Sequence, residues 1–550
     1  MKKIMVIAAM AVSVSAAAQD TYQSAQIAGD DLNGTARYVG MGGAMEALGA
    51  DISTMGTNPA GIGLFRKSQA SVSGGLQVFG GNYENNSLNS YLDGNKTTGS
   101  FDQAGFVLST KAGHDSWINF GFNYHKSKNF NQLLSAINTL NGASLNKVSF
   151  NKFMDVVTDA SDFYDPRYST VDWFNDMLVN PYITVEDPNY IPKDPNDPND
   201  KKYINQSFHS YFHAKDFTQQ QVQTGYISDY DFNISGNIHN RIYLGLTFGI
   251  KDVHYESRSL YTETLLDFDE QLNIDTDPMG TMSLDDSRII TGTGFNVKFG
   301  AIVRPVEDSP FRIGAYVHTP TWYKLTTSNY TEMLTEPIEG EMDGRSSEDI
   351  LKFRLNTPWL FGVSLGHTVG NIVALGATYE YSDYGALDNR VIDTDYYYDY
   401  DYGYYYDDES SYSDKAMKRN TEKSLKGVHT LRLGAEVKVC PEVALRFGYN
   451  YVSPKYQEYG CRDTDIPSQG VEFASTAAYT NWNATNRFTC GIGYAKGPFS
   501  VDVAYKYSQT NGDFYPFYDG IGTGEHANNP GATSVSDKRH QLLMTLGYRF

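Results

Sequence analysis

Few side chains in this sequence have the types and spacing that catalysis needs. His209 and His213 are four residues apart, so both rings would share one face of a helix and could bind haem. His429 and His540 stand at predicted strand ends, but neither has a convincing serine and orienting acid beside it, as a hydrolase requires. No phosphate-binding loop, dinucleotide fingerprint or zinc signature occurs. The sequence therefore predicts a protein that is not an enzyme and has no cofactor.

Two further groups of residues have side-chain atoms that can bind metal ions, but their spacing matches no metal-binding motif. The Tyr/Asp tract at 393–414 offers carboxylates of the kind that Ca²⁺ prefers, but its spacing matches no calcium loop. A solvated acidic surface is the simpler interpretation. Cys440, Cys461 and Cys490 form neither a disulfide framework nor a zinc set, and Cys440 and Cys490 fall in apolar strand patterns. We predict no metal site.

The N-terminus predicts export. Lys2 and Lys3 precede an apolar run and the small residues 16–18, which is the pattern of a signal peptide over residues 1–18. The net charge of -21 argues against nucleic acid as a partner, because phosphate binding needs basic patches. The 42 Tyr and 29 Phe are typical of strands that end in aromatic girdles at a membrane interface.

From residue 69 onward, apolar residues recur at every second position in segments of about ten residues, which predicts transmembrane β-strands. The last segment, 540–550, places Leu542, Met544, Leu546, Tyr548 and Phe550 on one face. A terminal Phe550 after this alternation resembles the C-terminal signal that the barrel-assembly machinery recognises in bacterial outer-membrane barrels.

About fourteen such segments are present, and the connections between them alternate between short and long. We predict an all-β fold: a single antiparallel transmembrane β-barrel with short periplasmic turns and long extracellular loops. The longest loops are 131–220, with a helical piece over 131–157, and 384–424. The segments begin near residues 69, 102, 116, 222, 241, 289, 311, 353, 371, 427, 443, 486, 498 and 539.

A barrel of this size has a bore that wall side chains alone do not fill. Many inward positions are glycine, which leaves room for a segment folded inside, although glycines also relieve strand curvature. We therefore predict an N-terminal hatch over residues 19–66 and a barrel over 67–550. The inward glycines are Gly245, Gly249, Gly300, Gly314, Gly362, Gly376, Gly434, Gly448, Gly491, Gly493 and Gly547.

The run GTARYVGMGGAMEALGADISTMGTNPAGI resembles the N-terminal hatch of the FadL/TodX family of outer-membrane transporters. That family has an alternating Gly/Ala pattern and then Asn-Pro-Ala just before its first barrel strand. The resemblance assigns the hatch and gating role to Arg37, Gly40, Gly42, Asn58, Pro59, Ala60 and Gly61.

The resemblance implies a monomeric outer-membrane channel for the passive uptake of hydrophobic compounds such as long-chain fatty acids, in contact with membrane lipid and lipopolysaccharide. In some members the cargo leaves sideways beside the third strand; here that strand, 116–130, has no proline, and Gly121 is the one residue that could kink it. Apolar residues of the long loop are expected to bind substrate: Leu133, Leu134, Ile137, Leu140 and Phe150.

A carboxylate cargo would be repelled by acidic loops unless Lys126, Lys128, Lys147 and Lys152 gather near the binding groove. Two alternatives remain open at this stage. One is a haem-binding surface receptor that uses His209 and His213, and the other is a general porin or structural barrel.

Overall fold

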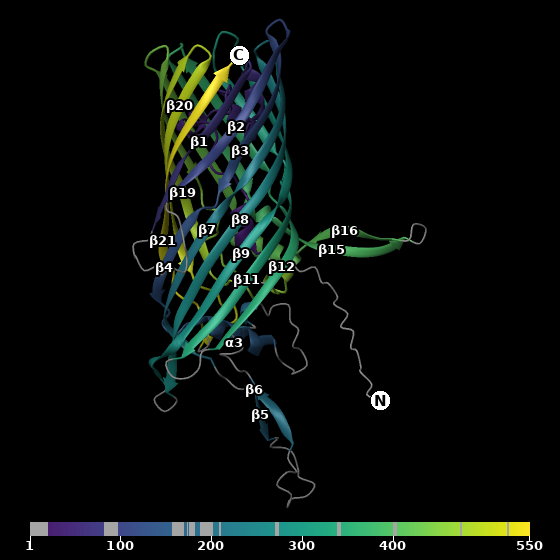
Figure 1. Ribbon diagram of the computed structural model, residues 1–550, viewed down its shortest axis with the longest axis vertical. Helices are drawn as coiled ribbons and strands as arrows, with labels where there is room; N and C mark the ends of the chain where they lie inside the picture. Colours follow the sequence, from purple (N-terminus) through teal and green to yellow (C-terminus); the bar gives the residue numbers. More distant parts are fainter. Residues whose placement is uncertain are drawn as a thin grey trace, which may run out of the picture.

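A computed structural model describes residues 20–81, 97–156, 170–172, 174, 182–186, 202–207, 211–269, 274–337, 343–399, 404–472, 476–524 and 527–550. The molecule is a long cylinder of tilted antiparallel strands (Figure 1). Its short turns gather at one end, together with the C-terminus. Long hairpins and loops extend from the other end, which is called the loop end below.

Fourteen strands form the closed wall, as predicted, and each predicted segment start but one falls in or next to one of them. The exception is 353, which precedes the wall strand that begins at Leu360. The last strand closes the cylinder against the first, with Gln69 opposite Arg549 and Gly81 opposite Asp537. The wall strands are β1 (Gln69–Gly81), β2 (Thr97–Gly113), β3 (Ser116–Asn129), β7 (His213–Ile238), β8 (Ile242–Asp269), β9 (Ile274–Val303), β10 (Arg312–His318), β13 (Leu360–Val369), β14 (Val373–Asp383), β17 (Gly427–Lys438), β18 (Val443–Val452), β19 (Tyr479–Lys496), β20 (Phe499–Tyr515) and β21 (Thr533–Arg549).

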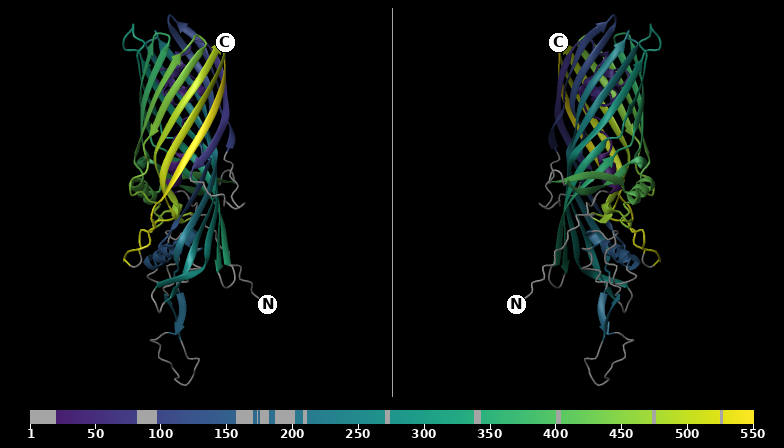
Figure 2. Two further views of the ribbon diagram at one scale, coloured as in Figure 1. Left: turned by 90° about the vertical axis from the view of Figure 1, so that its left-hand side faces the viewer. Right: turned by 90° about the vertical axis from the view of Figure 1, so that its right-hand side faces the viewer.

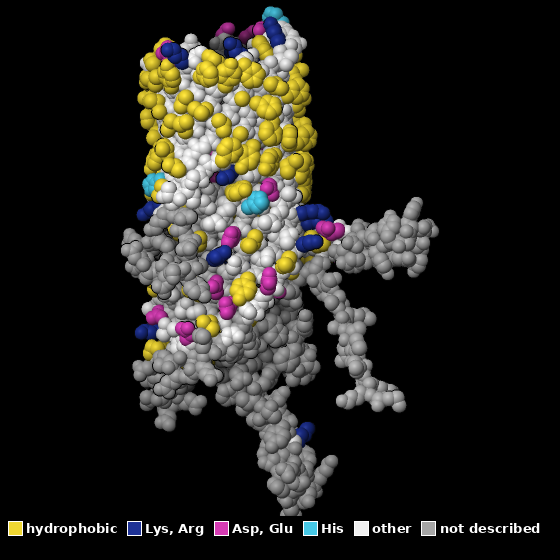
Figure 3. Space-filling model, in the orientation of Figure 1, with side chains coloured by type: hydrophobic (Ala, Val, Ile, Leu, Met, Phe, Trp, Pro, Cys, Tyr) yellow, Lys and Arg dark blue, Asp and Glu magenta, His cyan; other side chains and the backbone are white. Residues whose placement is uncertain are grey.

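The alternation of apolar and polar residues along each strand places apolar side chains on the outer face of this wall and polar side chains on the inner face. On β21, Leu542, Met544 and Leu546 are exposed on the outside, whereas Gln541 and Thr545 are buried inside. Exposed aliphatic and aromatic side chains of this kind form a band around the half of the cylinder nearest the short turns (Figure 3). Such a band is the surface that a β-barrel presents to lipid hydrocarbon.

Three neighbouring wall strands are interrupted at one level. Pro320 separates β10 from β11 (Trp322–Pro337), and Pro358 separates β12 (Asp343–Asn356) from β13. Next to them, the 3₁₀-helix η3 (Tyr384–Ala386) separates β14 from β15 (Asp388–Asp399). Proline has no N–H to give to the ladder, which explains the two breaks. The third strand, by contrast, is paired on both sides at Gly121, with Val107 of β2 and Asn233 of β7.

The predicted extracellular loops contain more strand than the sequence suggested. Strands β7, β8 and β9 continue far beyond the apolar band, so 256–269 and 274–286, expected as loop, are paired hairpin arms (Figure 2). Within the Tyr/Asp tract, β15 pairs with β16 (Tyr404–Ser413) in a hairpin that projects from the wall. The helix α5 (Lys415–Ser424) follows it, and α6 (Gln469–Glu472) lies in a later loop.

The predicted helix over 131–157 is wrong for its first part. Residues Gln132–Thr139 form strand β4, which pairs with β7, and only Leu145–Val156 is helical (α3). A separate two-stranded sheet joins β5 (Tyr182–Glu186) to β6 (Tyr203–Ser207). Among the described residues, no helix is long and apolar enough to cross a membrane.

Residues 20–66, called the N-terminal segment below, lie inside the cylinder as a chain of short helices. These are α1 (Thr21–Ile27), α2 (Ala36–Gly40), η1 (Ile52–Gly56) and η2 (Pro59–Leu64). Wall glycines make room for them, because a Cβ atom at these positions would overlap with the segment. They are Gly245 (against Pro59), Gly300 (Asn58), Gly376 (Ala44), Gly434 (Met41) and Gly448 (Gly42). Other predicted inward glycines face wall side chains, such as Gly362 against Tyr316.

Candidate functional site: the filled bore and its cavities

The glycine-rich part of the N-terminal segment fits tightly against the wall. Gly42 has a φ of 63°, in the left-handed region that favours glycine, and a Cβ there would lie 2.9 Å from the Leu433 oxygen and from the Tyr449 nitrogen. The Gly40 carbonyl accepts a hydrogen bond from the Thr489 hydroxyl at 3.1 Å. These contacts explain why small residues are needed here.

The Asn-Pro-Ala-Gly motif forms the turn from which η2 starts. The Asn58 side chain accepts from the Ala60 N–H and donates to the Glu46 carbonyl. The Pro59 carbonyl accepts from the Ser235 hydroxyl on β7 at 2.8 Å, and Gly61 passes close to Thr54. The motif therefore ties the segment to itself and to the wall just before β1.

Arg37 joins the segment to the wall through an ion-pair chain. Its guanidinium donates to both oxygens of Glu436 at 3.0 and 3.1 Å. Glu436 also binds Arg446, which continues to Asp502 at 2.6 Å. A bidentate arginine–carboxylate pair fixes both orientation and position. This arrangement fixes the N-terminal segment to β17 at Arg37.

Two further ion-pair clusters connect the segment to the wall. Glu46, which is fully buried, binds Arg432 at 2.8 Å, and Arg432 also binds Glu380 at 2.6 Å. Farther toward the loop end, Lys251 binds Asp30 of the segment at 2.8 Å and Asp229 of the wall at 2.7 Å. Buried charges of this kind are costly when a partner is removed, so these clusters hold the segment in one position.

His125, Asp229 and Asp231 have the geometry of a possible metal site, because one ligand atom from each lies within 4.8 Å of the others. Lysines already supply positive charge to both carboxylates, however. Lys251 is 2.7 Å from Asp229, and Lys298 is 2.9 Å from Asp231. The group is therefore better explained as an ion-pair cluster.

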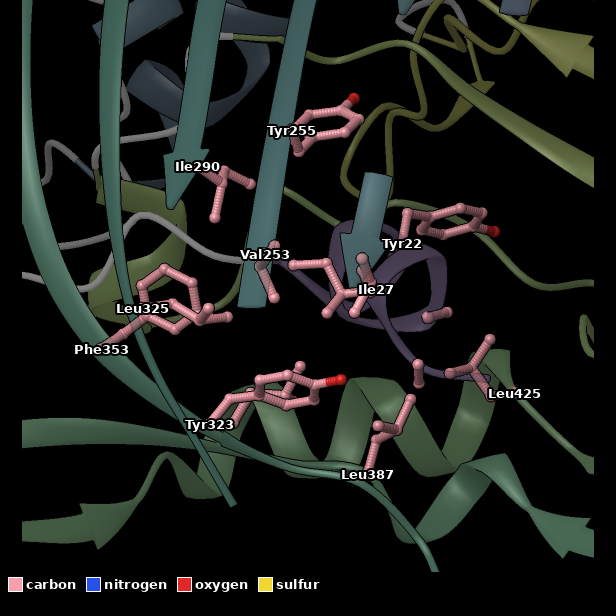
Figure 4. Packing of buried hydrophobic residues seen from close by; sticks show 14 of the residues in the cluster. Tyr22, Ile27, Val253, Tyr255, Ile290, Tyr323, Leu325, Phe353, Leu387 and Leu425 are labelled. Carbon is pink, nitrogen blue, oxygen red and sulfur yellow. The ribbon is translucent and has the colours of Figure 1, made fainter. Parts of the chain in front are cut away.

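The helix α1 packs into an apolar cluster of the inner wall. Ile27 points from α1 toward Val253, whereas the Tyr22 ring points to the opposite side (Figure 4). Tyr255, Ile290, Tyr323, Leu387 and Leu425 belong to the same buried cluster. The Tyr22 ring also stacks on Tyr456 with centroids 5.0 Å apart. Apolar packing thus holds one end of the segment, and ion pairs hold the rest.

Two cavities adjoin the N-terminal segment on its loop side. The first has a volume of about 280 Å³ and lies between α1 and the walls β7, β19 and β20. The second, about 270 Å³, extends from residues 28–33 to Pro358, where the wall strands are interrupted. Both cavities are bounded by Asp31, Lys128, Lys455 and Arg487. Burial, together with the neighbouring Lys128, lowers the pKa of Lys455 to about 7.

The lining of the first cavity is unlike an apolar pocket. It has eight basic side chains against three carboxylates, together with eight glutamines and seven aromatic rings. Among the described residues, no Leu, Ile, Val or Met contributes to it. Of the four lysines that a carboxylate cargo would need near its groove, Lys126 and Lys128 line this cavity. The sequence did not single out the other basic residues for it, which are Arg288, Lys455, Arg462, Arg487, Lys506 and Arg539. Lys506 stands between Tyr505 and Tyr507 on β20 and so follows the two-residue alternation, which was the available signal for it.

The five apolar residues expected to bind substrate do not form one surface. Leu134 and Leu140 are buried in a cluster at the loop end, with Phe217 and Phe514. Phe150 is buried on α3, where its ring lies 4.9 Å from Tyr211. Leu133 is half-buried, and Ile137 is 56% exposed, because β4 turns alternate residues to opposite faces. None of the five lines the two cavities.

The remaining sequence candidates lie apart from the cavities. Lys152 pairs with Asp172 at 2.7 Å, and Lys147 lies over the Tyr211 ring. His213 begins strand β7, so the helical spacing assumed for the histidine pair does not apply; His209 lies outside the described residues.

The strand histidines and the cysteines show no catalytic arrangement among the described residues. His429 and His540 each contact a tyrosine hydroxyl, at 2.7 and 2.8 Å. Cys440 and Cys490 are exposed and Cys461 is buried, and all three are free thiols. Burial raises the pKa of Cys461 to about 11, which leaves its thiol poorly nucleophilic.

No model of a protein family matches this chain, and no curated protein matches it. Among solved structures it is similar to a Pseudomonas aeruginosa FadL homologue, at 13% identity and a TM-score of 0.46, over 95% of this chain and 100% of that chain. It is also similar to the Ralstonia pickettii toluene transporter TbuX, at 13% identity and a TM-score of 0.44, over 94% and 99%. The Pseudomonas putida toluene transporter TodX has 10% identity and a TM-score of 0.46, over 94% and 99%. At these scores, the function has to be argued from the chain's own residues.

Proposed function

We propose that this protein is an outer-membrane channel for the passive uptake of hydrophobic and amphipathic small molecules, and that residues 20–66 form the hatch that gates it. One observation carries the proposal: a separate segment fills the bore directly beside two cavities, and ion pairs and close glycine contacts hold it there. A structural filler would need no cavities beside it. A permanently open porin would need an empty bore, so the filled bore favours gated passage.

In this proposal the signal peptide 1–18 is removed, and the protein lies in the outer membrane as a monomer among lipid and lipopolysaccharide. Cargo enters from the loop end and reaches the cavities, and a shift of the hatch lets it pass. Apolar cargo gains about 25 cal/mol per Å² of apolar surface that leaves water, which supplies the driving force for capture.

A disulfide that locks the hatch tests the gate. The hydroxyls of Thr21 on α1 and Thr421 on α5 are in contact at 2.9 Å, so cysteines there would be within bonding reach. In a chain whose three native cysteines are replaced by alanine, we expect oxidised Thr21→Cys/Thr421→Cys to abolish uptake of radiolabelled dodecanoic acid by whole cells. Reductant should restore the uptake.

A matched disulfide within the wall is the control. Thr262 and Ser283 on the neighbouring strands β8 and β9 are in contact at 3.0 Å outside both cavities, and Thr262→Cys/Ser283→Cys leaves the hatch free. Oxidation of this pair should not change uptake. Equal uptake by the oxidised and reduced hatch-locked protein would refute a gate that moves at α1.

Removal of Phe550 tests the assembly signal. Phe550 is exposed on the outside, and its N–H donates to the Ser68 carbonyl at 3.0 Å, where the last strand meets the first. We propose that the barrel-assembly machinery binds this aromatic end. Deletion of Phe550 should lower the amount of heat-modifiable protein in the outer membrane, whereas Phe550→Tyr should not. Equal amounts for all three chains would contradict the proposal.

A further inference from the structure

We propose that Asp31 occupies the binding site of an anionic cargo, and that an organic carboxylate with a flat, aromatic body displaces Asp31 and thereby frees the hatch. The inference rests on the proposed function and names the chemical class of the cargo and the contact that it breaks. It starts from the charges that surround Asp31 at the junction of the two cavities.

Asp31 is one carboxylate among several cations. Arg487 approaches it at 3.3 Å, and the charges of Lys128, Arg539 and Lys506 also act on it. The N–H of Asn129 donates to its other oxygen at 3.2 Å. Arg539 has a second partner, Asp537, at 2.8 Å. The positive charge around Asp31 therefore exceeds what one carboxylate neutralises.

Three lysines of this cluster form no direct ion pair among the described residues and donate instead to carbonyls of the N-terminal segment. Lys455 donates to Ala25 at 2.7 Å, Lys128 to Ala28 and Gly29 at 3.3 Å, and Lys506 to Leu32 at 2.6 Å. A carboxylate adds the Coulomb attraction between opposite charges to such a hydrogen bond, which a neutral carbonyl does not. An incoming carboxylate would therefore compete well for these lysines.

The same contacts hold the hatch. One carbonyl belongs to Ala25 in the last turn of α1, and the others belong to the link that follows α1, at Ala28, Gly29 and Leu32. An anion that draws Lys128, Lys455 and Arg487 away removes hydrogen bonds and the Asp31 ion pair together. When these basic side chains bind the cargo carboxylate in place of the N-terminal segment, the cargo is bound and α1 is released in the same step.

The first cavity fits the body of such an anion. Tyr22, Phe130, Tyr255, Tyr456 and Trp482 offer ring faces, and glutamine amides offer hydrogen bonds. Aromatic side chains stack on flat organic rings, whereas the absence of aliphatic residues from the lining gives a flexible alkyl chain little to pack against. The lining therefore favours an aromatic carboxylate over a neutral hydrocarbon.

Binding of 2-naphthoate and of its neutral isostere 2-naphthamide tests the proposal on the full chain in maltoside detergent at neutral pH. Asp31→Asn removes the competing charge but keeps an oxygen for the Asn129 N–H. We expect this variant to bind 2-naphthoate about tenfold more tightly than the unaltered protein. Its affinity for 2-naphthamide should stay the same. Asp252→Asn, an equal charge change on β8 outside both cavities, should alter neither affinity.

The proposal is overturned if Asp31→Asn leaves the affinity for 2-naphthoate unchanged or lowers it, or if 2-naphthamide gains equally. Lys455→Gln provides a second variant should Asp31→Asn fail to assemble, and it must weaken binding of 2-naphthoate and not of 2-naphthamide. A negative result in these binding experiments would not refute the gated channel, because uptake blocked by the Thr21–Thr421 disulfide would still identify a gate.

Discussion

Replacing Gly376 by valine is expected to turn the closed bore into a conducting one. Gly376 faces inward on β14, where a Cβ would overlap with the Ala44 oxygen and lie 3.3 Å from Leu48 Cδ1. The obstacle is backbone, which cannot rotate away as a flexible side chain does. Overpacking of this kind costs about 1–3 kcal/mol. The N-terminal segment is held without a covalent bond along its length, so displacement of the segment relieves the overlap.

Single-channel recordings in planar bilayers check this expectation. The unaltered protein should give small or rare current steps, and Gly376→Val should give frequent, larger ones while the protein keeps its heat-dependent gel shift. Gly99→Val on β2 is the matched control, because a Cβ there has no atom within 4 Å. Equal conductance of the two variants would mean that the segment does not close the bore through this contact.

The wall could be predicted from the sequence because its faces lie in different solvents. On β21, Leu542 lies outside and Gln541 lies inside. A wall with lipid hydrocarbon on one side and a polar bore on the other requires this alternation. The fourteen strand positions follow from repeating that argument. The glycine-rich N-terminal segment was also predictable, since its motif precedes β1 and needs small wall residues beside it.

The loop end could not be predicted in the same way. Residues 132–139 alternate weakly, and their apolar positions fit a helix as well as a strand, so pairing with β7 decided the outcome. On the long hairpin arms of β8 and β9, the apolar residues Tyr261, Leu265, Met282 and Leu284 are buried. Their pattern is therefore not the alternation with apolar residues outside on which the method depends.

The chemistry of the bore was hidden for a different reason. Glu436 and Arg37 are 399 residues apart, and only the register of the wall brings them together. The net charge of -21 describes the whole chain, whereas the first cavity has eight basic side chains and three carboxylates. Composition therefore pointed away from an anionic cargo, and the local arrangement of charges points toward one.

Loss of the Arg432 guanidinium is expected to be the most destabilising single change in the bore. Its partners Glu46 and Glu380 come from the segment and from β14, and the side chain of each is at most 6% exposed. Arg432→Ala leaves both carboxylates buried without their cation. Breaking a buried pair in this way costs about 3–5 kcal/mol. The urea midpoint of the barrel in detergent should fall accordingly.

Two comparisons separate this electrostatic effect from a general loss of packing. Arg258→Ala removes a cation from an exposed pair with Glu256, at 3.2 Å, and should cost less than about 1 kcal/mol. The triple variant Arg432→Met/Glu46→Gln/Glu380→Gln removes the charges together and should recover most of the lost stability. A triple variant as unstable as Arg432→Ala would show that shape, and not charge, holds the segment at this point.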